Sequence, residues 1–263
     1  MDASAGERIA RKRCEQIERI RQAGRVVHDV LELLAGAAVP GVSTAELDEL
    51  ARRRTLELGA QPAFLGYRGY PASLCVSVNE QVIHGIPSPA RRLRDGDLVG
   101  LDYGVILAGW YADAARTVAV GRASARAARL RDATRRALAA GLAAVRPGAR
   151  VGDVGAAVQA CAQAAGYSVV REFVGHGIGR RLHEPPQVPN HGPAGTGPVL
   201  AEGMVLAVEP MLTAGGPAVR TLDDGWTAVT LDGSLSAHFE HTVAVTRKGP
   251  EILTLPEGVP FTP

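Results

Sequence analysis

Two aspartates stand in a stretch whose pattern predicts a β-hairpin. Asp102 lies in the apolar segment 98–107, Ala108-Gly109 offers a turn, and Asp113 follows on strand-favouring residues. Folding at that turn would bring Asp113 back beside Asp102 among apolar neighbours. Because an unpaired carboxylate is costly to bury, either cations lie between these side chains or the carboxylates are not deeply buried. We interpret the hairpin as half of a metal site.

The other half of that site is expected later in the chain. His176 lies between glycines, Glu209 ends the predicted strand 204–208, and Glu240 begins the predicted strand 240–245. Each residue alone is a weak signal, since a lone histidine or a strand-end glutamate is usually a surface residue. If they converge with Asp102 and Asp113, four carboxylates repel one another in a dry cleft. Two divalent cations would balance that charge, whereas one Mg²⁺ would not and would leave the histidine unexplained.

Composition restricts the class of protein. The chain has 263 residues, of which 46% are hydrophobic, and a net charge of +2, so it can bury a sizeable core and shows no DNA-binding signature. It has no signal peptide or membrane-spanning run, which favours a cytoplasmic protein. Three widely spaced cysteines indicate neither a disulfide framework nor a zinc ribbon. The arginine-rich first twenty residues fit a solvated helix face better than a ribosome contact.

Helical patterns and stop signals divide the chain into elements. Apolar residues recur at helical spacing over about 7–38, and a capping box at 43–46 predicts a second helix that ends near Gly59. We expect a loop at 64–71, strands at 73–78 and 204–208, and a helix over 123–145. Residues 184–189, rich in proline, are expected to form a rigid connector.

An internal repeat is visible at an offset of 107 residues, which relates Pro40 to Pro147 and Asp102 to Glu209. Its approximate limits are 40–113 and 147–240. Chance can match such common stop residues, and two domains on a linker are a competing interpretation, but the offset holds without gaps and no Gly/Ser-rich or Pro-rich linker is visible. We therefore expect two similar α/β halves that face each other across a pseudo-twofold axis. His84 and His191 share the offset, a match that we treat as coincidence.

Several motifs together closely resemble those of type I methionine aminopeptidases, from about Ile9 to Leu255 and in the family's order. The motifs are His84-Gly-Ile-Pro, Asp102 with Asp113, Gly-His176-Gly-Ile-Gly, His183-Glu-Pro-Pro, Glu209-Pro-Met, Asp224-Gly-Trp226 and Ser236-Ala-His-Phe-Glu240-His. The resemblance implies the pita-bread α/β (α+β) fold of peptidase family M24, with a central antiparallel sheet covered by helices. It also implies one catalytic domain over residues 1–263.

The resemblance implies a role for each site residue. Asp102 would chelate one metal ion, Asp113 and Glu240 would bridge two ions, and His176 and Glu209 would bind the second. Glu209 would also transfer a proton. His84 and His183 would contact the substrate and assist proton movement, and a side-chain pocket would be lined by Tyr67, Tyr70, Cys75 and Trp226.

The implied reaction is removal of N-terminal methionine from nascent proteins and peptides, with a small second residue preferred. The cofactors would be two divalent ions, either cobalt, manganese, iron or zinc, because availability in the cell selects among such metals. The protein would be a cytoplasmic monomer. Its partners would be nascent polypeptide N-termini, without DNA or membrane contacts.

This chain departs from the family pattern at several positions. At five positions this chain has a glycine or an alanine where the family usually carries another residue, often one with a hydroxyl group. These positions are Gly104, Ala112, Ala114, Ala115 and Ala207. Lost hydroxyl support can lower metal affinity or activity roughly ten- to a hundred-fold. Phe64 replaces a smaller cysteine and Leu182 replaces phenylalanine, which would reshape the pocket.

Two rival functions remain open. An Xaa-Pro peptidase shares the fold but usually carries an extra N-terminal domain, and only about a hundred residues precede Asp102. A weakly active or non-catalytic binding paralogue is the other rival, although such proteins typically lose metal ligands that this chain keeps.

Overall fold

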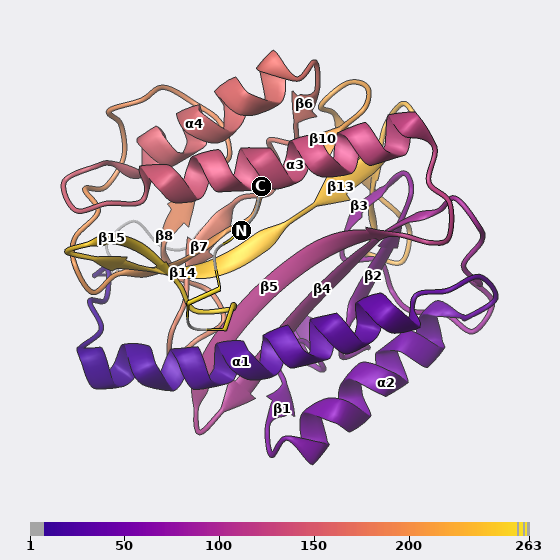
Figure 1. Ribbon diagram of the computed structural model, residues 1–263, viewed down its shortest axis with the longest axis horizontal. Coiled ribbons are helices and arrows are strands. Elements are labelled where there is room, and N and C mark those ends of the chain that lie inside the picture. Colours follow the sequence, from indigo (N-terminus) through magenta and orange to yellow (C-terminus); the bar gives the residue numbers. More distant parts are fainter. Residues whose placement is uncertain (1–7, 257, 260, 262–263) are drawn as a thin grey trace.

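The computed structural model describes residues 8–256, 258–259 and 261. It contains a curled antiparallel sheet with helices on one side (Figure 1). The helices are α1 (Cys14–Ala37), α2 (Thr44–Glu57), α3 (Ala125–Ala144) and α4 (Val151–Ala164), with a 3₁₀ turn at Tyr67–Gly69. The strands are β1 (Gln61–Pro62), β2 (Cys75–Val78), β3 (Gln81–Ile83), β4 (Leu98–Leu107), β5 (Trp110–Ala119), β6 (Ser168–Val169), β7 (Gly175–Gly177), β8 (Glu184–Val188), β9 (Val205–Val208), β10 (Met211–Thr213), β11 (Val219–Thr221), β12 (Ala228–Thr230), β13 (Ser236–His238), β14 (Glu240–Thr246) and β15 (Gly249–Ile252). The mixed α/β class and the helix-covered antiparallel sheet expected from the sequence are confirmed.

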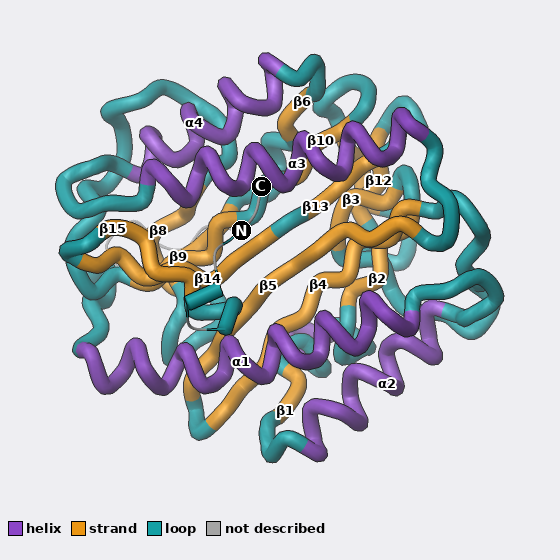
Figure 2. Tube along the Cα trace, in the orientation of Figure 1, coloured by secondary structure: helices purple, strands orange, loops and turns teal. Residues whose placement is uncertain are grey.

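The central sheet has the strand order β1-β4-β5-β14-β9-β7-β8, with β2 beside β4 and β15 beside β14. Figure 2 shows its long strands running between the two helix pairs. Two smaller sheets have the orders β13-β10-β6 and β11-β12-β3. No helix in the described part of the chain combines the length and apolar character needed to cross a membrane.

The predicted hairpin is confirmed as β4 and β5. Ala108 and Gly109 both have positive φ angles, 50° and 76°, as the tight turn of a two-residue hairpin requires. Asp102 pairs with Ala115, and Asp113 pairs with Gly104. Since residues two apart on a strand face the same side, the two aspartates are diagonal neighbours on one face of the sheet.

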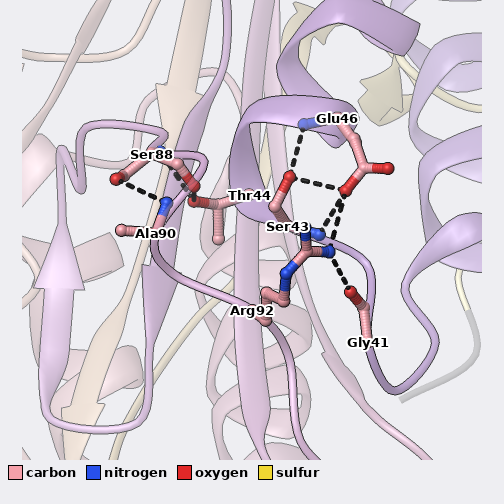
Figure 3. A network of polar contacts seen from close by, with 7 residues as sticks. All are labelled: Gly41, Ser43, Thr44, Glu46, Ser88, Ala90 and Arg92. Carbon is pink, nitrogen blue, oxygen red and sulfur yellow. Dashed lines mark hydrogen bonds and ion pairs between the residues drawn. The ribbon is translucent and has the colours of Figure 1, made fainter.

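The predicted capping box starts α2 (Figure 3). The Ser43 hydroxyl accepts the main-chain N–H of Glu46 at 3.2 Å, and the Glu46 carboxylate accepts the main-chain N–H of Ser43 at 2.8 Å. Arg92 donates to the Gly41 carbonyl at 2.7 Å and lies 3.5 Å from the Glu46 carboxylate. These contacts fix the first turn of α2 to the loop before β4.

The 107-residue offset also relates the elements themselves. Helix α2 covers 44–57 and α4 covers 151–164, while β4 begins at 98 and β9 at 205. Main-chain hydrogen bonds recur as well, from Gly41 to the Leu93 carbonyl and from Gly148 to the Leu200 carbonyl. In Figure 1 the pair α1/α2 faces the pair α3/α4 across β5 and β14, as a pseudo-twofold axis would require.

Two boundaries differ from the sequence prediction. Helix α1 begins at Cys14 rather than near residue 7, which lies outside the described residues. The described residues before it, 8–13, are not helical, and the Lys12 N–H donates to the Gly203 carbonyl at 2.6 Å instead of to a helical neighbour. Residues 184–188 form strand β8 instead of a connector. Its prolines are tolerated because β8 is the edge strand of the sheet.

Apolar side chains of the first helix pair pack against the first half of the sheet. Leu31 of α1, Leu47 of α2 and Leu101 of β4 belong to one buried cluster. Inside it the Tyr103 hydroxyl hydrogen-bonds the Thr55 hydroxyl at 2.6 Å, so the buried polar groups are paired. A second cluster joins α3 and α4 to the other half of the sheet.

Candidate active site

Every residue that the sequence predicted for the site lines one cavity of about 150 Å³. The proposed metal ligands come from neighbouring strands in the order β4-β5-β14-β9-β7, each of which contributes one ligand in or directly beside the strand. The cavity is lined by Asp102, Asp113, Glu240, Glu209 and His176, by His84 and His183, and by Tyr67, Tyr70, Cys75 and Trp226. Adjacent strands therefore bring together residues that lie up to 138 positions apart, from Asp102 to Glu240.

Three of the five predicted ligands lie close enough together to hold a metal ion. Asp113, His176 and Glu240 each offer one ligand atom, and these three atoms lie within 4.8 Å of one another. The His176 Nε2 lies 3.6 Å from a Glu209 carboxylate oxygen. His176 directs its other ring nitrogen to the Gly177 carbonyl at 3.0 Å, which leaves Nε2 to face the cavity.

The electrostatics of these carboxylates favour bound cations. Burial raises the pKa of Asp113 to about 7, and burial with neighbouring negative charge raises the pKa of Asp102, Glu209 and Glu240 well above its usual value. Within the described residues, one buried oxygen of each of Asp102, Asp113 and Glu240 has no hydrogen-bond partner. Carboxylate oxygens and an imidazole nitrogen are suitable ligands for divalent metals, so these residues fit a metal centre.

Main-chain support for Asp113 comes from the neighbouring strand. The Thr242 hydroxyl of β14 donates to the Asp113 carbonyl at 2.7 Å and accepts the Asp113 N–H at 3.1 Å. The alanines at 112, 114 and 207 offer no hydroxyl, as the sequence indicated. Thr242 on the neighbouring strand β14 therefore fixes this part of β5.

Both predicted catalytic histidines lie beside the ligands. The rings of His183 and His176 are 4.1 Å apart, and the His183 Nδ1 is 2.8 Å from the Tyr67 hydroxyl. His183 is exposed at the cavity mouth, yet the protein packed against its ring lowers its pKa, with further lowering by His176 and Arg68. Burial lowers the pKa of His84 to about 4. Both rings are therefore neutral near pH 7.

Aromatic rings form the wall of the predicted side-chain pocket. The Tyr70 hydroxyl donates to the carbonyls of Leu74 and Gly85 at 3.1 and 3.0 Å, so its polar end is satisfied away from the cavity. Trp226 meets the Tyr70 ring edge-on, with centroids 5.0 Å apart. Cys75 is buried and pairs with Asp102 across β2 and β4, which places the pocket directly beside the ligands.

Gly104 and the Phe64 ring pack closely against each other. A Cβ placed on Gly104 would lie 2.7 Å from Cε1 of Phe64, which is closer than real side chains approach. The Phe64 ring thus occupies the space that a larger residue at 104 would need. Phe64 and Leu182 both line the cavity, so both side chains contribute to the shape of its wall.

His238 was not assigned a role from the sequence. It is buried on β13, and its Nε2 lies 4.0 Å from the Glu209 carboxylate and has no hydrogen-bond partner among the described residues. Its position two residues before Glu240 was a usable signal, because alternate residues of an extended chain face the same side. His191, which shares the repeat offset with His84, lines a different small cavity with Gln159.

Comparison with known proteins gives a consistent result. Residues 18–247 match the family described as "Metallopeptidase family M24". "Methionine aminopeptidase" of Clostridium acetobutylicum is 50% identical over 242 residues, 92% of this chain and 97% of that protein. "Methionine aminopeptidase 1" of Mycobacterium tuberculosis is 48% identical over 95% of this chain and 97% of its own length.

Solved structures show the same fold. The crystal structure of methionine aminopeptidase from Rickettsia prowazekii has a TM-score of 0.93, with 42% identity over 94% of this chain and 100% of that chain. Prolidase from Pyrococcus furiosus has a TM-score of 0.77 and 23% identity, and the match covers 94% of this chain but only 66% of the prolidase. The second likeness shows the fold alone.

Proposed function

This chain belongs to metallopeptidase family M24, and from that premise we propose that it is a methionine aminopeptidase, which removes methionine from the N-terminus of peptides and nascent proteins. The observation that carries the proposal is the convergence of four carboxylates and His176 beside an aromatic pocket in one cavity. Identity near 50% to two methionine aminopeptidases over almost the whole chain supports it further. An Xaa-Pro peptidase has only the fold in its favour.

The metal centre would hold two divalent ions. Asp102 would bind the first, Asp113 and Glu240 would be shared between both, and His176 and Glu209 would bind the second. The charge of four neighbouring carboxylates supports this number, because a single divalent ion would leave them half neutralised. When bound, such ions activate water and polarise a carbonyl group.

The surrounding residues orient the substrate and move protons. The Tyr67 hydroxyl lies 2.8 Å from the His183 Nδ1. In the tautomer in which this hydroxyl donates to Nδ1, the His183 Nε2–H is free to donate to the carbonyl oxygen of the first peptide bond. Glu209 accepts a proton from the attacking water and delivers it to the leaving amine. His84, whose ring lies 6.0 Å from that of Trp226, lines the same cavity and contacts the substrate there.

The pocket selects the first side chain. Tyr70, Trp226 and Cys75 present apolar surface, and the Tyr70 hydroxyl is already bonded to main-chain carbonyls. A flexible thioether fits such a surface without leaving a polar group unpaired. A small second residue is preferred, since the carbonyl must approach His183 closely at the cavity mouth.

One catalytic domain extends over residues 1–263, because Asp102 and Asp113 come from the first repeat and the other ligands from the second. Neither repeat alone completes the centre. The protein acts as a cytoplasmic monomer on emerging polypeptide N-termini. The exposed arginines Arg8, Arg11, Arg13 and Arg19 form a solvated surface rather than a ribosome contact, whereas Lys12 between them is buried. Residues 1–7 lie outside the described residues.

A peptide panel tests the proposed function. Metal-stripped protein is titrated with cobalt, manganese, iron or zinc and assayed on Met-Ala-Ser, Met-Leu-Ser, Leu-Ala-Ser and Ala-Pro peptides. Release of methionine from Met-Ala-Ser, saturating near two ions per chain, is the expected result. Cleavage of Ala-Pro without release of methionine would establish the Xaa-Pro peptidase, and the absence of any metal-activated cleavage would establish a binding protein.

A further inference from the structure

A buried ion pair connects the segment before α1 to the turn that carries His183. The Lys12 Nζ lies 2.7 Å from Oε2 of Glu184, and the two side chains are only 5% and 7% exposed. The pair joins residues 172 positions apart, and Glu184 directly follows His183 in the chain. Neither charged residue belongs to the metal centre or lines the cavity.

Glu184 uses its second oxygen to hold the turn before it. Oε1 accepts the main-chain N–H groups of Arg180 at 2.7 Å and of Arg181 at 3.2 Å. A Cβ on Gly179 would lie 2.6 Å from Lys12 Cε and 2.9 Å from Glu184 Oε1, so the turn packs directly on the ion pair. The carboxylate thus fixes residues 179–183 from the inside.

Further hydrogen bonds and packing contacts hold Lys12 and the 179–183 turn in place. The Lys12 N–H donates to the Gly203 carbonyl at 2.6 Å, which fixes the lysine to the loop before β9. On the outer side, Tyr111 donates its N–H to the Gly179 carbonyl at 2.9 Å, and the Arg180 guanidinium lies 4.0 Å from the centre of the Trp110 ring. The turn is therefore held between the β4–β5 hairpin and Lys12.

Charge explains why a lysine is needed. Burial disfavours the Glu184 carboxylate, but the Lys12 hydrogen bond and charge, with the two main-chain amides, leave its pKa below the usual value. Removing one partner of a buried ion pair leaves the other charge uncompensated. Without Lys12, the Glu184 carboxylate would turn toward water or take up a proton, and its hold on the two amides would weaken.

We propose that Lys12 is a positioning residue for His183, acting through Glu184 and the 179–183 turn. The inference rests on the proposed contact of His183 with the substrate carbonyl. Lys12 itself touches neither the substrate nor the metal ligands. Because misplacement of a substrate-orienting group by about 1 Å can cost on the order of a hundredfold in rate, partial loosening of the turn should lower kcat on the order of tenfold.

The test compares Lys12→Met with the matched variant Arg11→Met. Arg11 precedes Lys12, is exposed, and donates to the Glu202 carbonyl at 2.7 Å, so its loss removes a contact of the same segment without touching the turn. Lys12→Met is expected to lower kcat about tenfold, with unchanged metal content and KM within about twofold. Arg11→Met is expected to keep kcat within about twofold of wild type.

A double-mutant cycle separates positioning from general stability. In a His183→Ala background, Lys12→Met should change kcat by less than about twofold, because the group it positions is already absent. Full multiplication of the two effects, or a Lys12→Met protein that loses thermal stability but keeps its kcat, would overturn the inference and leave the proposed function intact. Wild-type kcat in His183→Ala would instead refute the proposed role of His183 as well.

Ring ¹⁵N chemical shifts of His183 provide a readout that needs no turnover or metal. Lys12→Met should move the Nδ1 shift, since the contact with the Tyr67 hydroxyl loosens, whereas Arg11→Met should not. If Lys12→Met does not fold, Glu184→Gln replaces it, because the amide keeps the side-chain size while removing the charge. Unchanged His183 shifts in a folded variant of either residue would overturn the inference.

Discussion

Replacing Gly104 by alanine should overpack the wall between β4 and the cavity. The added Cβ would lie 2.7 Å from Cε1 and 3.3 Å from Cζ of Phe64, and 3.2 Å from Cβ of Ala63. Phe64 is only 8% exposed, so its ring cannot move into solvent. Overpacking of this kind typically costs about 1–3 kcal/mol. At about 2–4 °C per kcal/mol for a chain of this size, Tm should fall by about 2–12 °C.

The matched control is Gly100→Ala on the same strand. Its Cβ would meet no atom closer than 3.5 Å, an ordinary contact, so we expect a change in Tm of less than about 2 °C. Thermal unfolding of the metal-free protein measures both variants. Since Phe64 lines the cavity, Gly104→Ala should also raise KM for a Met-Ala-Ser peptide, while Gly100→Ala should leave KM unchanged.

A second background identifies the atom responsible. Phe64→Cys removes the ring, so Gly104→Ala should then cost less than about 0.5 kcal/mol in unfolding free energy. The coupling between the two substitutions should therefore be about 0.5–3 kcal/mol in the double-mutant cycle. If Gly104→Ala costs the same with and without the ring, the steric explanation for these two departures is wrong.

The remaining predictions concern the metal centre and the core. Glu240→Ala should abolish turnover and lower metal content, which metal analysis checks. The metal-free variant should unfold at the same or a higher temperature in calorimetry, because one of several repelling buried carboxylates is gone. The stability of metal-free protein should fall as pH rises from about 4, the usual carboxyl pKa, through the raised pKa of Asp113 at about 7. The reason is that folding favours the protonated carboxyls. Excess metal should remove this pH dependence. Tyr103→Phe should lose about 0.5–1.5 kcal/mol of unfolding free energy by removing the hydrogen bond to Thr55, with kcat unchanged; denaturant unfolding measures the loss.

Local patterns were sufficient for much of the fold. The β4–β5 hairpin follows from alternating residues and a turn at Ala108-Gly109, and α2 follows from its capping box. These features depend on residues close in sequence, which is why they could be predicted. The convergence of the site residues depends on five strands lying side by side. Local sequence pattern could not predict that adjacency. The resemblance of the motifs to a known family did predict it.

Contacts between distant segments account for what the sequence did not reveal. The segment before α1 meets a distant loop, since the Lys12 N–H donates to the Gly203 carbonyl, and β8 pairs with β7 as a strand. The close packing of Gly104 against Phe64 is likewise a contact across 40 positions. Neither periodicity nor residue propensity predicts these contacts, because a single residue does not indicate which distant segment it will contact.

The repeat accounts for four of the five predicted ligands. Asp102 and Glu209 occupy equivalent positions in the two halves at the 107-residue offset, and both line the cavity. In the strand order β4-β5-β14-β9, β5 lies beside β4 as β14 lies beside β9, so Asp113 and Glu240 come one from each half. The offset does not relate these two residues, because 11 positions separate Asp102 from Asp113 whereas 31 separate Glu209 from Glu240, with β10 to β13 between. His176 is the exception, since the residue at the same offset in the first half is Gly69, which has no side chain to offer.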